Sequence, residues 1–293
     1  VVMLGVQKGV EKVSKLMMPV LLILIVGISI YTLTLPGAID GLIYYVKPDF
    51  NQFSIKTVIA AVGQLFYSMS LAMGIMITYG SYMRKEDNIE SSVRQIEVFD
   101  TLVAFLAGLI IVPAVFVFSG GDENALNAGP SLMFITLPNV FKEMLGGQIV
   151  GAVFFLLVVL AAMTSSISLM ETVVSIVEER FHWKRIPSCL IVTGISFLIG
   201  LLSVFGYSIW SDFTIFHMQF LDFFDYISNN IMMPIVALMT CVLVGFVVKT
   251  TFVEDEIEKN TRFRAKGLYR VMIKFICPIC MLLILFSALF LKL

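Results

Sequence analysis

Apolar residues fall into long runs along the chain, and polar and charged residues fill the short intervals between them. Seven runs approach or exceed the length of about 20 residues at which a helix crosses a hydrocarbon core of about 30 Å. They lie at 17–36, 57–83, 98–119, 147–177, 187–205, 219–248 and 270–291. This pattern predicts seven membrane-spanning helices within a single transmembrane domain that covers residues 1–293.

The composition supports an all-α polytopic membrane protein. Hydrophobic residues make up 59% of the chain, charged residues only 14%, and the mean hydropathy is +0.96. Soluble domains carry about 25% charged residues. The sequence contains no nucleophile–base arrangement, phosphate-binding loop or metal-ligand cluster, which argues against an enzyme. The net charge of −1 gives no support to nucleic-acid binding.

The basic residues predict an orientation. Sixteen Lys and Arg residues lie before the first run and in the second, fourth and sixth intervals, or just inside the last run, whereas four lie on the opposite side. Cytoplasmic loops carry the excess of Lys and Arg, so we expect a cytoplasmic amino end and an outside carboxyl end. The opening stretch VVMLGVQKGVEKVSK is too short and polar for a signal peptide and is typical of an internal loop. We therefore expect a fragment that lacks its natural amino terminus.

The stretch GQLFYSMSLAMG, residues 63–74, is unusual for the middle of a membrane-spanning helix. It places Gln64, Tyr67, Ser68 and Ser70 between two glycines, and both residue types disfavour an unbroken helix. If the helix unwinds near 68–72, freed carbonyl groups and half-helix ends can face a ligand. The alternative is a kinked helix whose serines bond back to its own carbonyls.

A second polar stretch lies in the fourth run. Ala161, Thr164, Ser165 and Ser168 are spaced i, i+3, i+4 and i+7, so they share one helix face. Their hydroxyl and carbonyl oxygens suit a small alkali cation, while small residues also serve plain helix packing. Glu171 follows in the same run, as a proton-linked acid or as a structural hydrogen-bond anchor, and we favour the anchor.

Two loops are long enough to carry structure. Residues 120–146 contain an apolar segment that is too short to span and is broken by Pro138, which favours a hairpin dipping back toward the membrane. Residues 249–270 mix charges of both signs. We expect a surface helix there that serves as a solvated connector.

Several motifs resemble the neurotransmitter:sodium symporter family, especially its bacterial amino-acid transporters. GQLFYSMSLAMGIMITYGSYM resembles the sixth helix of that family, and AAMTSSISLMETVVS its eighth. FDTLVAFLAG resembles the seventh helix, GPSLMFITLPNVF the outer lid loop, LDFFDY the start of the tenth helix, and GVEKVSKLMMP the entry to the fifth. The resemblance covers nearly the whole chain, in order.

The resemblance implies an inverted-repeat amino-acid transporter fold of which this chain holds helices five to eleven. The missing amino-terminal helices of the same protein would supply the other half of each site, because the family's first helix is also broken. Ser68 and Asp100 match the first sodium site, and Ala161, Thr164 and Ser165 match the second. The implied substrate-binding residues are Tyr67, Ser68, Ser70, Met73, Ser165 and Leu169, and the implied outer gate consists of Tyr67 and Asp225.

The resemblance further implies a sodium-coupled symporter that imports an amino acid across the plasma membrane by alternating access. Its partners would be a small amino acid, Na⁺ and the lipid bilayer, with sodium as co-transported ligand and no other cofactor. Two alternatives remain from the sequence: a membrane sensor that binds the ligand without moving it, and an inactive remnant of a split transporter. An ion channel is disfavoured because the sequence contains no repeated filter loop.

Overall fold

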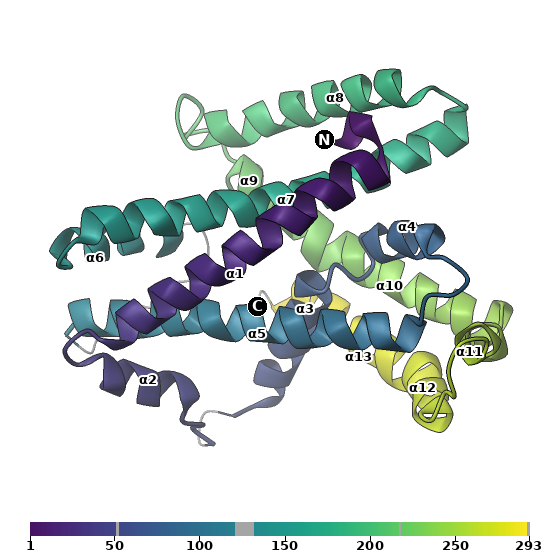
Figure 1. The fold of residues 1–293 in the computed structure, drawn as a ribbon, viewed down its shortest axis with the longest axis horizontal. Coiled ribbons are helices and arrows are strands. Elements are labelled where there is room, and N and C mark those ends of the chain that lie inside the picture. The colour runs from purple at the N-terminus through teal and green to yellow at the C-terminus, as the bar shows by residue number, and fades with distance from the viewer. Residues whose placement is uncertain (51–52, 121–131, 217, 292–293) are drawn as a thin grey trace. The chain divides into compact units, whose positions relative to one another are not determined.

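The computed structural model describes residues 1–50, 53–120, 132–216 and 218–291, and it is almost entirely helical (Figure 1). Within these ranges no β-strand forms, and a single isolated bridge joins Ile215 and Met218. The α-helices are α1 (Lys12–Leu33), α2 (Ala38–Val46), α3 (Ile55–Ser68), α4 (Ile75–Tyr82), α5 (Ile89–Phe118), α6 (Leu137–Glu143), α7 (Gly147–Phe181), α8 (Arg185–Gly206), α9 (Phe220–Asp225), α10 (Met233–Val242), α11 (Thr250–Glu258), α12 (Lys266–Val271) and α13 (Cys277–Phe286).

Six helical stretches of the described chain are long and apolar enough to cross a membrane. They are Val6–Leu33, Ile89–Phe118, Gly147–Phe181, Arg185–Gly206, Phe220–Val247 and Lys266–Leu289. Each overlaps one of the apolar runs in the sequence, and most extend beyond the run into charged residues, since a helix need not end where the hydrocarbon does. Asn88, for example, accepts a hydrogen bond from the Ser91 amide (3.0 Å), which caps α5 in polar sequence well before its apolar part.

The run at 57–83 is not one helix. It forms α3, which has 14 residues, and α4, which has 8. An irregular segment at 69–74 separates the two helices. Ser54 begins α3 with a reciprocal capping box, in which its hydroxyl accepts from the Thr57 amide at 3.4 Å. Of the seven runs, this is the one whose polar centre left open either an unwound break or a kinked helix, and the structure has the break.

The helices cluster into two compact units. The first consists of Val1–Phe53 and Val98–Ser168, and the second of Ser54–Glu97 and Leu169–Leu293. The core of the first unit lies among α1, α5, α6 and the first part of α7. Ser29 of α1 also donates to the Leu106 carbonyl of α5 at 3.1 Å, which satisfies its hydroxyl between the two helices.

The short helix α2 packs closely on α5 within the first unit. A Cβ added to Gly41 would lie only 2.7 Å from the Cα of Pro113, so this contact requires glycine. Tyr45 crosses α5 at Gly108, where its ring stacks on Phe105 with centroids 5.6 Å apart. Two glycines on facing helices therefore allow the close approach.

In the second unit, α10 packs along α13, and α3 also contacts α13. Several helices contain π-helical segments: η5 (Tyr226–Met232) and η6 (Leu243–Val247) flank α10, and η7 (Met272–Ile276) joins α12 to α13. Tyr226 of η5 donates to the Ala288 carbonyl at 3.1 Å. This side chain links the span Phe220–Val247 to the span Lys266–Leu289.

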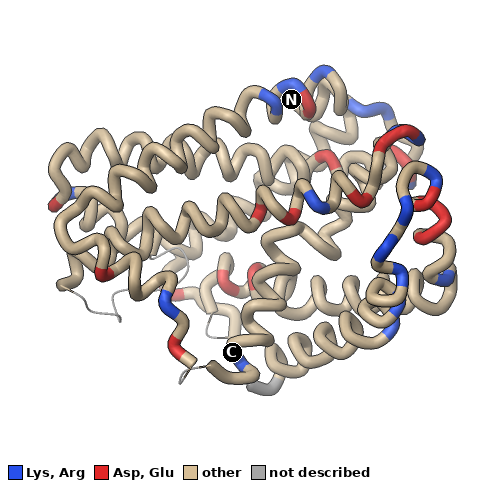
Figure 2. The backbone as a smooth tube through the Cα atoms, turned by 60° about the horizontal axis from the view of Figure 1, so that its bottom comes forward, with Lys and Arg blue, Asp and Glu red and all other residues tan. Residues whose placement is uncertain are grey.

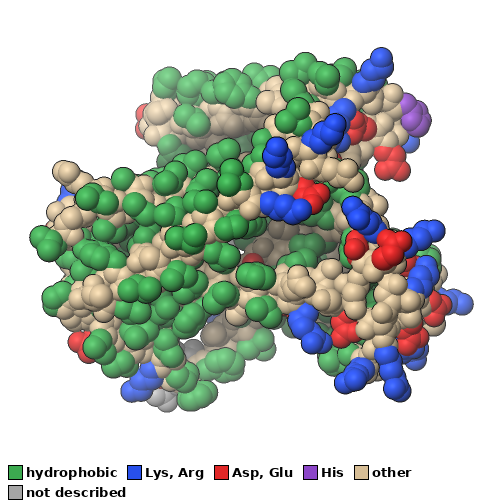
Figure 3. Space-filling model, in the orientation of Figure 1, with side chains coloured by type: hydrophobic (Ala, Val, Ile, Leu, Met, Phe, Trp, Pro, Cys, Tyr) green, Lys and Arg blue, Asp and Glu red, His purple; other side chains and the backbone are tan. Residues whose placement is uncertain are grey.

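Charged residues gather in the turns and near helix ends, while the long helices are covered with hydrophobic side chains (Figures 2 and 3). The segment 249–270 carries many of these charges and forms α11, as expected. The expectation of a merely solvated connector is wrong, because Thr250, Glu254 and Ile257 are buried on one side of α11. Glu254 pairs with Arg270, and sequence spacing alone did not indicate this partner.

Part of the loop at 120–146 lies outside the described residues, including 121–131, where the predicted hairpin would begin. The described part forms a π-helical segment, Leu132–Thr136, followed by α6 with Pro138 in its first turn. Leu137, Val140 and Phe141 are buried in the core of the first unit.

Replacing Gly41 with valine should lower the free energy of unfolding by about 1–3 kcal/mol, because the new side chain meets the α5 backbone. Thermal unfolding of the purified protein in detergent measures this change. Gly27→Ala is the control, since nothing lies within 4 Å of a Cβ at that position. Equal melting temperatures for the two variants would contradict the proposed contact.

Candidate functional site

The break between α3 and α4 is the most distinctive backbone feature of the second unit. Ser70, Ala72 and Gly74 have φ angles of 54°, 64° and 80°, which lie in the left-handed region. Such conformations cost non-glycine residues about 1–3 kcal/mol each and cluster at functional sites. The amides of Ser70 and Leu71 bond to the carbonyls of Tyr67 and Phe66, both at 3.0 Å, so the chain turns tightly as it leaves α3.

This turn gives α4 its own amino terminus in the middle of an apolar run. Gly74 is the N-cap of α4, and its carbonyl accepts from the Thr78 amide at 2.9 Å. The first amides of a helix have no partner within it and carry partial positive charge, while the carbonyls at the end of a helix such as α3 carry partial negative charge. The break therefore presents both hydrogen-bond donors and acceptors to a small zwitterionic or ionic ligand.

Four of the predicted site residues lie at this break. Tyr67 and Ser68 form the last turn of α3, and Tyr67 keeps 46% of its surface exposed. Ser70 and Met73 lie within the irregular segment, where both are partly buried. The backbone thus brings an aromatic ring, two hydroxyl groups and a thioether to one short segment.

A second group lies on α7. The Thr164 hydroxyl donates to the Ala161 carbonyl at 2.8 Å, and the Ser168 hydroxyl donates to the Thr164 carbonyl at 3.1 Å. Ser165 is exposed on the same helix, and Leu169 follows one turn later. This face of α7 therefore carries a row of hard oxygen atoms, the ligand type that alkali and alkaline-earth cations prefer.

The two predicted carboxylates lie on other helices. Asp100 is partly buried within α5, and Asp225 is exposed at the end of α9, where its Oδ1 accepts from the side-chain Nδ2 of Asn229 at 2.6 Å. Asp100, Ala161, Thr164 and Ser165 belong to the first unit; the residues of the break, Leu169 and Asp225 belong to the second. These two groups of residues thus lie in different units. A single pocket that contains both groups is part of the proposed function.

The packing of α4 against α7 within the second unit fixes the start of α4. A Cβ on Gly74 would lie 3.0 Å from the Cγ2 atom of the buried Thr172. Glycine at this position thus serves both the left-handed backbone and the close contact. The break is held against α7 one residue after Glu171.

Glu171 is fully buried and forms the centre of a polar cluster. Its Oε1 accepts from the Tyr82 hydroxyl of α4 at 2.9 Å, and its Oε2 pairs with Nη2 of Arg185 at the start of α8. Arg185 also pairs with Glu178 at 3.2 Å. The cluster agrees with the structural anchor favoured from the sequence. Tyr82 and Arg185 were not predicted from the sequence as partners of Glu171. The position of each residue at a helix end was the available signal.

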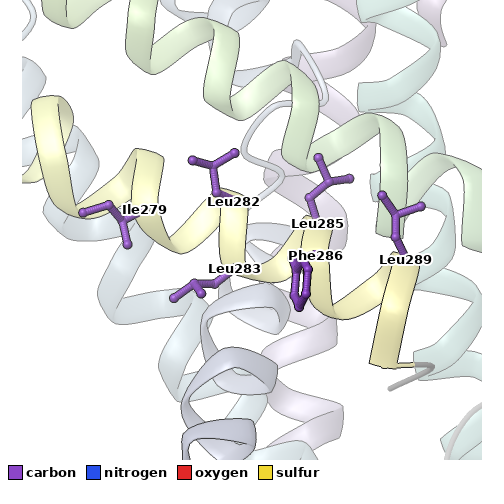
Figure 4. Close-up of a pocket in the computed structure, with 6 residues that line it drawn as sticks. All are labelled: Ile279, Leu282, Leu283, Leu285, Phe286 and Leu289. Atoms are coloured by element: carbon purple, nitrogen blue, oxygen red, sulfur yellow. The ribbon is translucent and has the colours of Figure 1, made fainter.

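The second unit also has an apolar hollow of about 440 Å³. Figure 4 shows the side chains that line it, all from the last span: Ile279, Leu282, Leu283, Leu285, Phe286 and Leu289. None of these six side chains can pair with an ammonium, a carboxylate or a metal ion. The hollow therefore does not suit a polar ligand, in contrast to the break at 69–74.

The sequence model of the sodium:neurotransmitter symporter family matches residues 1–292, which is nearly the entire chain. The chain belongs to this family. It is a family of sodium-dependent transporters, not of enzymes, and its members are multi-pass membrane proteins. The all-α, inverted-repeat fold expected from the sequence is confirmed.

Among the relatives is an uncharacterized sodium-dependent transporter of Haemophilus influenzae, 35% identical over 98% of this chain and 62% of its own length. Another is the sodium-dependent transporter YhdH of Bacillus subtilis, 31% identical over 97% of this chain and 62% of its own length. Among solved structures, MhsT in complex with L-phenylalanine is similar with a TM-score of 0.85 and 32% identity, over 98% of this chain and 65% of MhsT. The chain thus spans less than two thirds of the length of these proteins.

Replacing Arg185 with methionine should lower the free energy of unfolding by about 3–5 kcal/mol, because it leaves the buried Glu171 without its cation. The double variant Arg185→Met, Glu171→Gln should recover part of the loss, since no buried charge remains. Tyr82→Phe should lower the free energy of unfolding by about 1–3 kcal/mol, because it removes the hydroxyl that donates to Glu171. Thermal unfolding of the four proteins measures these effects, and a double variant no more stable than Arg185→Met argues against a charge effect.

Replacing Gly74 with alanine should destabilise the protein by about 1–3 kcal/mol, because alanine is strained at a φ of 80° and contacts Thr172. Adding Thr172→Ser removes the contacting methyl group and should restore only the part due to the contact. Gly80→Ala in the same helix is the control. Its Cβ meets open space, so its stability should be unchanged or higher by up to about 1 kcal/mol.

Proposed function

We propose that the complete protein is a sodium-coupled symporter that imports an amino acid across the plasma membrane by alternating access. The observation that carries this proposal is the broken helix: three left-handed residues interrupt an apolar run between α3 and α4. Irregular backbone within a membrane is tolerated where it is covered by protein or lines a polar cavity. In transporters with broken helices, such a segment binds the substrate and its coupling ions.

The proposed ion sites use the oxygen atoms described above. The first sodium ion would be held by Ser68 and Asp100, and the second by the Ala161 carbonyl together with Thr164 and Ser165. The 2.8 Å bond between Thr164 and the Ala161 carbonyl supports the second site, because it places two of the three oxygens side by side. The Asp100 carboxylate adds a negative charge that favours a cation in the first site.

The proposed substrate is a small amino acid, which carries both an ammonium and a carboxylate. Carbonyls near Tyr67 and Ser68 would accept from the ammonium, and Ser70, Met73, Ser165 and Leu169 would line the remainder of the pocket. Tyr67 would close over the substrate, with Asp225 as the acidic half of the outer gate. The L-phenylalanine named with the similar MhsT structure supports an amino acid as the substrate class.

The same proposal places the two units in one transmembrane domain within the lipid bilayer. The distribution of Lys and Arg supports a cytoplasmic amino end and an outside carboxyl end for this chain. Amino-terminal helices of the same protein would complete each site, in keeping with relatives that are longer than this chain.

Transport requires that each ligand bind one conformation better than the other, since a ligand shifts an equilibrium only by its differential affinity. Sodium bound from outside would favour the outward-open state, and the amino acid would then favour closure. The membrane potential adds about 2.3 kcal/mol per charge for every 100 mV. This energy can drive substrate accumulation only if ion and substrate movements are coupled at the shared site.

Ser68→Ala and Thr164→Val should each raise the sodium concentration for half-maximal uptake by about fivefold to tenfold, since each removes one oxygen from a proposed ion site. The measurement is uptake of radiolabelled amino acids by the complete protein in sealed vesicles with an imposed sodium gradient. Ser166→Ala is a matched control, because this hydroxyl on the same helix bonds to the Met163 carbonyl (3.0 Å) and belongs to neither site.

An unchanged sodium dependence in both site variants would overturn the site assignment. Sodium-dependent binding without any accumulation in the vesicles would instead point to a sensor. A complete protein that neither binds nor accumulates any amino acid in the presence of sodium would point to an inactive remnant.

A further inference from the structure

The connection between α10 and α12 is fixed to the last span by an ion pair between the buried carboxylate of Glu254 and the half-exposed Arg270. Arg270 donates from Nε to Oε1 of Glu254 at 2.8 Å and from Nη2 to Oε2 at 2.6 Å. This two-pronged geometry matches the planar guanidinium to the carboxylate, which makes the pair both directional and strong. Glu254 is only 2% exposed, so its charge depends on this partner.

The pair persists at neutral pH. The hydrogen bonds from Arg270 hold the pKa of Glu254 below its ordinary value of 4.5, and they outweigh the opposing effect of burial. Because the pKa is lowered in the folded protein, the stabilisation is fully present above the ordinary value and is lost only as the pH falls through the lowered one. Glu254 therefore stays ionised, and its charge pairing with Arg270 is kept, across the physiological pH range.

The other end of α11 reaches the turn that follows α4. Asn260, two residues beyond α11, donates from Nδ2 to the carbonyl oxygens of Lys85 at 2.7 Å and Asp87 at 2.9 Å. One side chain thus holds two backbone groups about 175 residues away in sequence. The turn itself is compact, because the Arg84 amide donates to the Asp87 carboxylate at 2.8 Å.

These contacts form a continuous connection within the second unit. It runs from the last span through Arg270 and Glu254 to α11, and from Asn260 to the turn between α4 and α5. We name residues 250–260 the strap. The α4 end that the strap reaches belongs to the broken helix, but the strap does not include any residue of the proposed binding sites.

We infer that Asn260 is a positioning residue of the transport cycle: the strap tethers the turn after α4 to the last span and so favours the conformation in which this turn stays beside the end of α11. The inference rests on the proposed function for its role in transport. A contact made in one conformation stabilises that conformation alone, so its removal shifts the equilibrium toward states in which α4 has moved away.

The test measures how readily α4 leaves this conformation. Thr78 of α4 is a suitable reporter position, because its side chain is buried in this conformation and a cysteine is close to it in size. In the complete protein carrying Thr78→Cys, the rate of thiol modification is measured in membrane vesicles with and without sodium. The same protein without Thr78→Cys gives the background from Cys189, Cys241, Cys277 and Cys280.

Asn260→Ala should raise the modification rate of the reporter about threefold to tenfold, as expected for the loss of two neutral hydrogen bonds. Asn260→Asp should raise it at least as much, because it has nearly the same shape and sets a carboxylate against two carbonyl oxygens. Gln95→Ala is the control: this exposed side-chain amide near the start of α5 donates to the Ser91 hydroxyl one turn earlier, at 3.4 Å, and its removal should leave the rate unchanged.

Folded Asn260→Ala and Asn260→Asp proteins that modify at the parent rate would overturn the inference. If Asn260→Ala does not fold, the isosteric Asn260→Asp and the strap variant Glu254→Gln decide the question by the same assay. A uniform loss of uptake without a change in modification rate would also count against positioning, because it indicates a merely structural role.

The reporter assay does not require transport. A parent protein without sodium-dependent uptake would refute the proposed function, while the modification rates would still test whether the strap restrains α4. Where uptake is present, Asn260→Ala should also change the sodium concentration for half-maximal uptake, although it touches neither ion site. An unchanged value together with an unchanged reporter rate refutes the inference alone.

Discussion

Hydrogen bonding of the main chain is the constraint on which this structure depends. Hydrocarbon offers no partners to backbone amides and carbonyls, so a chain that crosses it must form helices that satisfy these groups internally. The six long apolar helices do so. The segment between α3 and α4 interrupts this pattern: Ser70 and Leu71 bond back to α3, and the first amides of α4 have no partner within their own helix. A polar site follows from the backbone before any side chain is considered.

Buried charges in the second unit obey the same constraint. Glu171 and Glu254 are almost fully buried, and they meet Arg185 at the start of α8 and Arg270 near the start of the last span. A buried carboxylate is tolerated only when it is paired and hydrogen-bonded, so each pair also fixes the turn that brings its arginine. Glu171 thereby ties α4 and α8 to α7, and Glu254 ties α11 to α12.

The apolar runs predicted the helices well because each run is a property of consecutive residues. The glycines and serines of 63–74 indicated the break for the same reason, since they act on their own backbone. Tyr82 and Arg185 could not be assigned to Glu171 in this way, because they lie 89 and 14 residues from it and meet it only after the helices pack. The two bonds of Asn260 are still more remote from any local pattern. The family resemblance supplied candidate roles for Asp100 and Asp225 that spacing could not.

The π-helical segments have a consequence for how these spans tolerate change. A π-helical turn holds one residue more than an α-helical turn and keeps the helix continuous. Across η5 and η6, on either side of α10, and across η7 before α13, the face that a given residue presents is therefore rotated relative to an uninterrupted α-helix. A single-residue deletion in such a segment can be absorbed by conversion to α-helical geometry, whereas the same deletion within α7 would rotate every following side chain away from its partners. The spans that contain α10 and α13 thus carry built-in allowance for length variation.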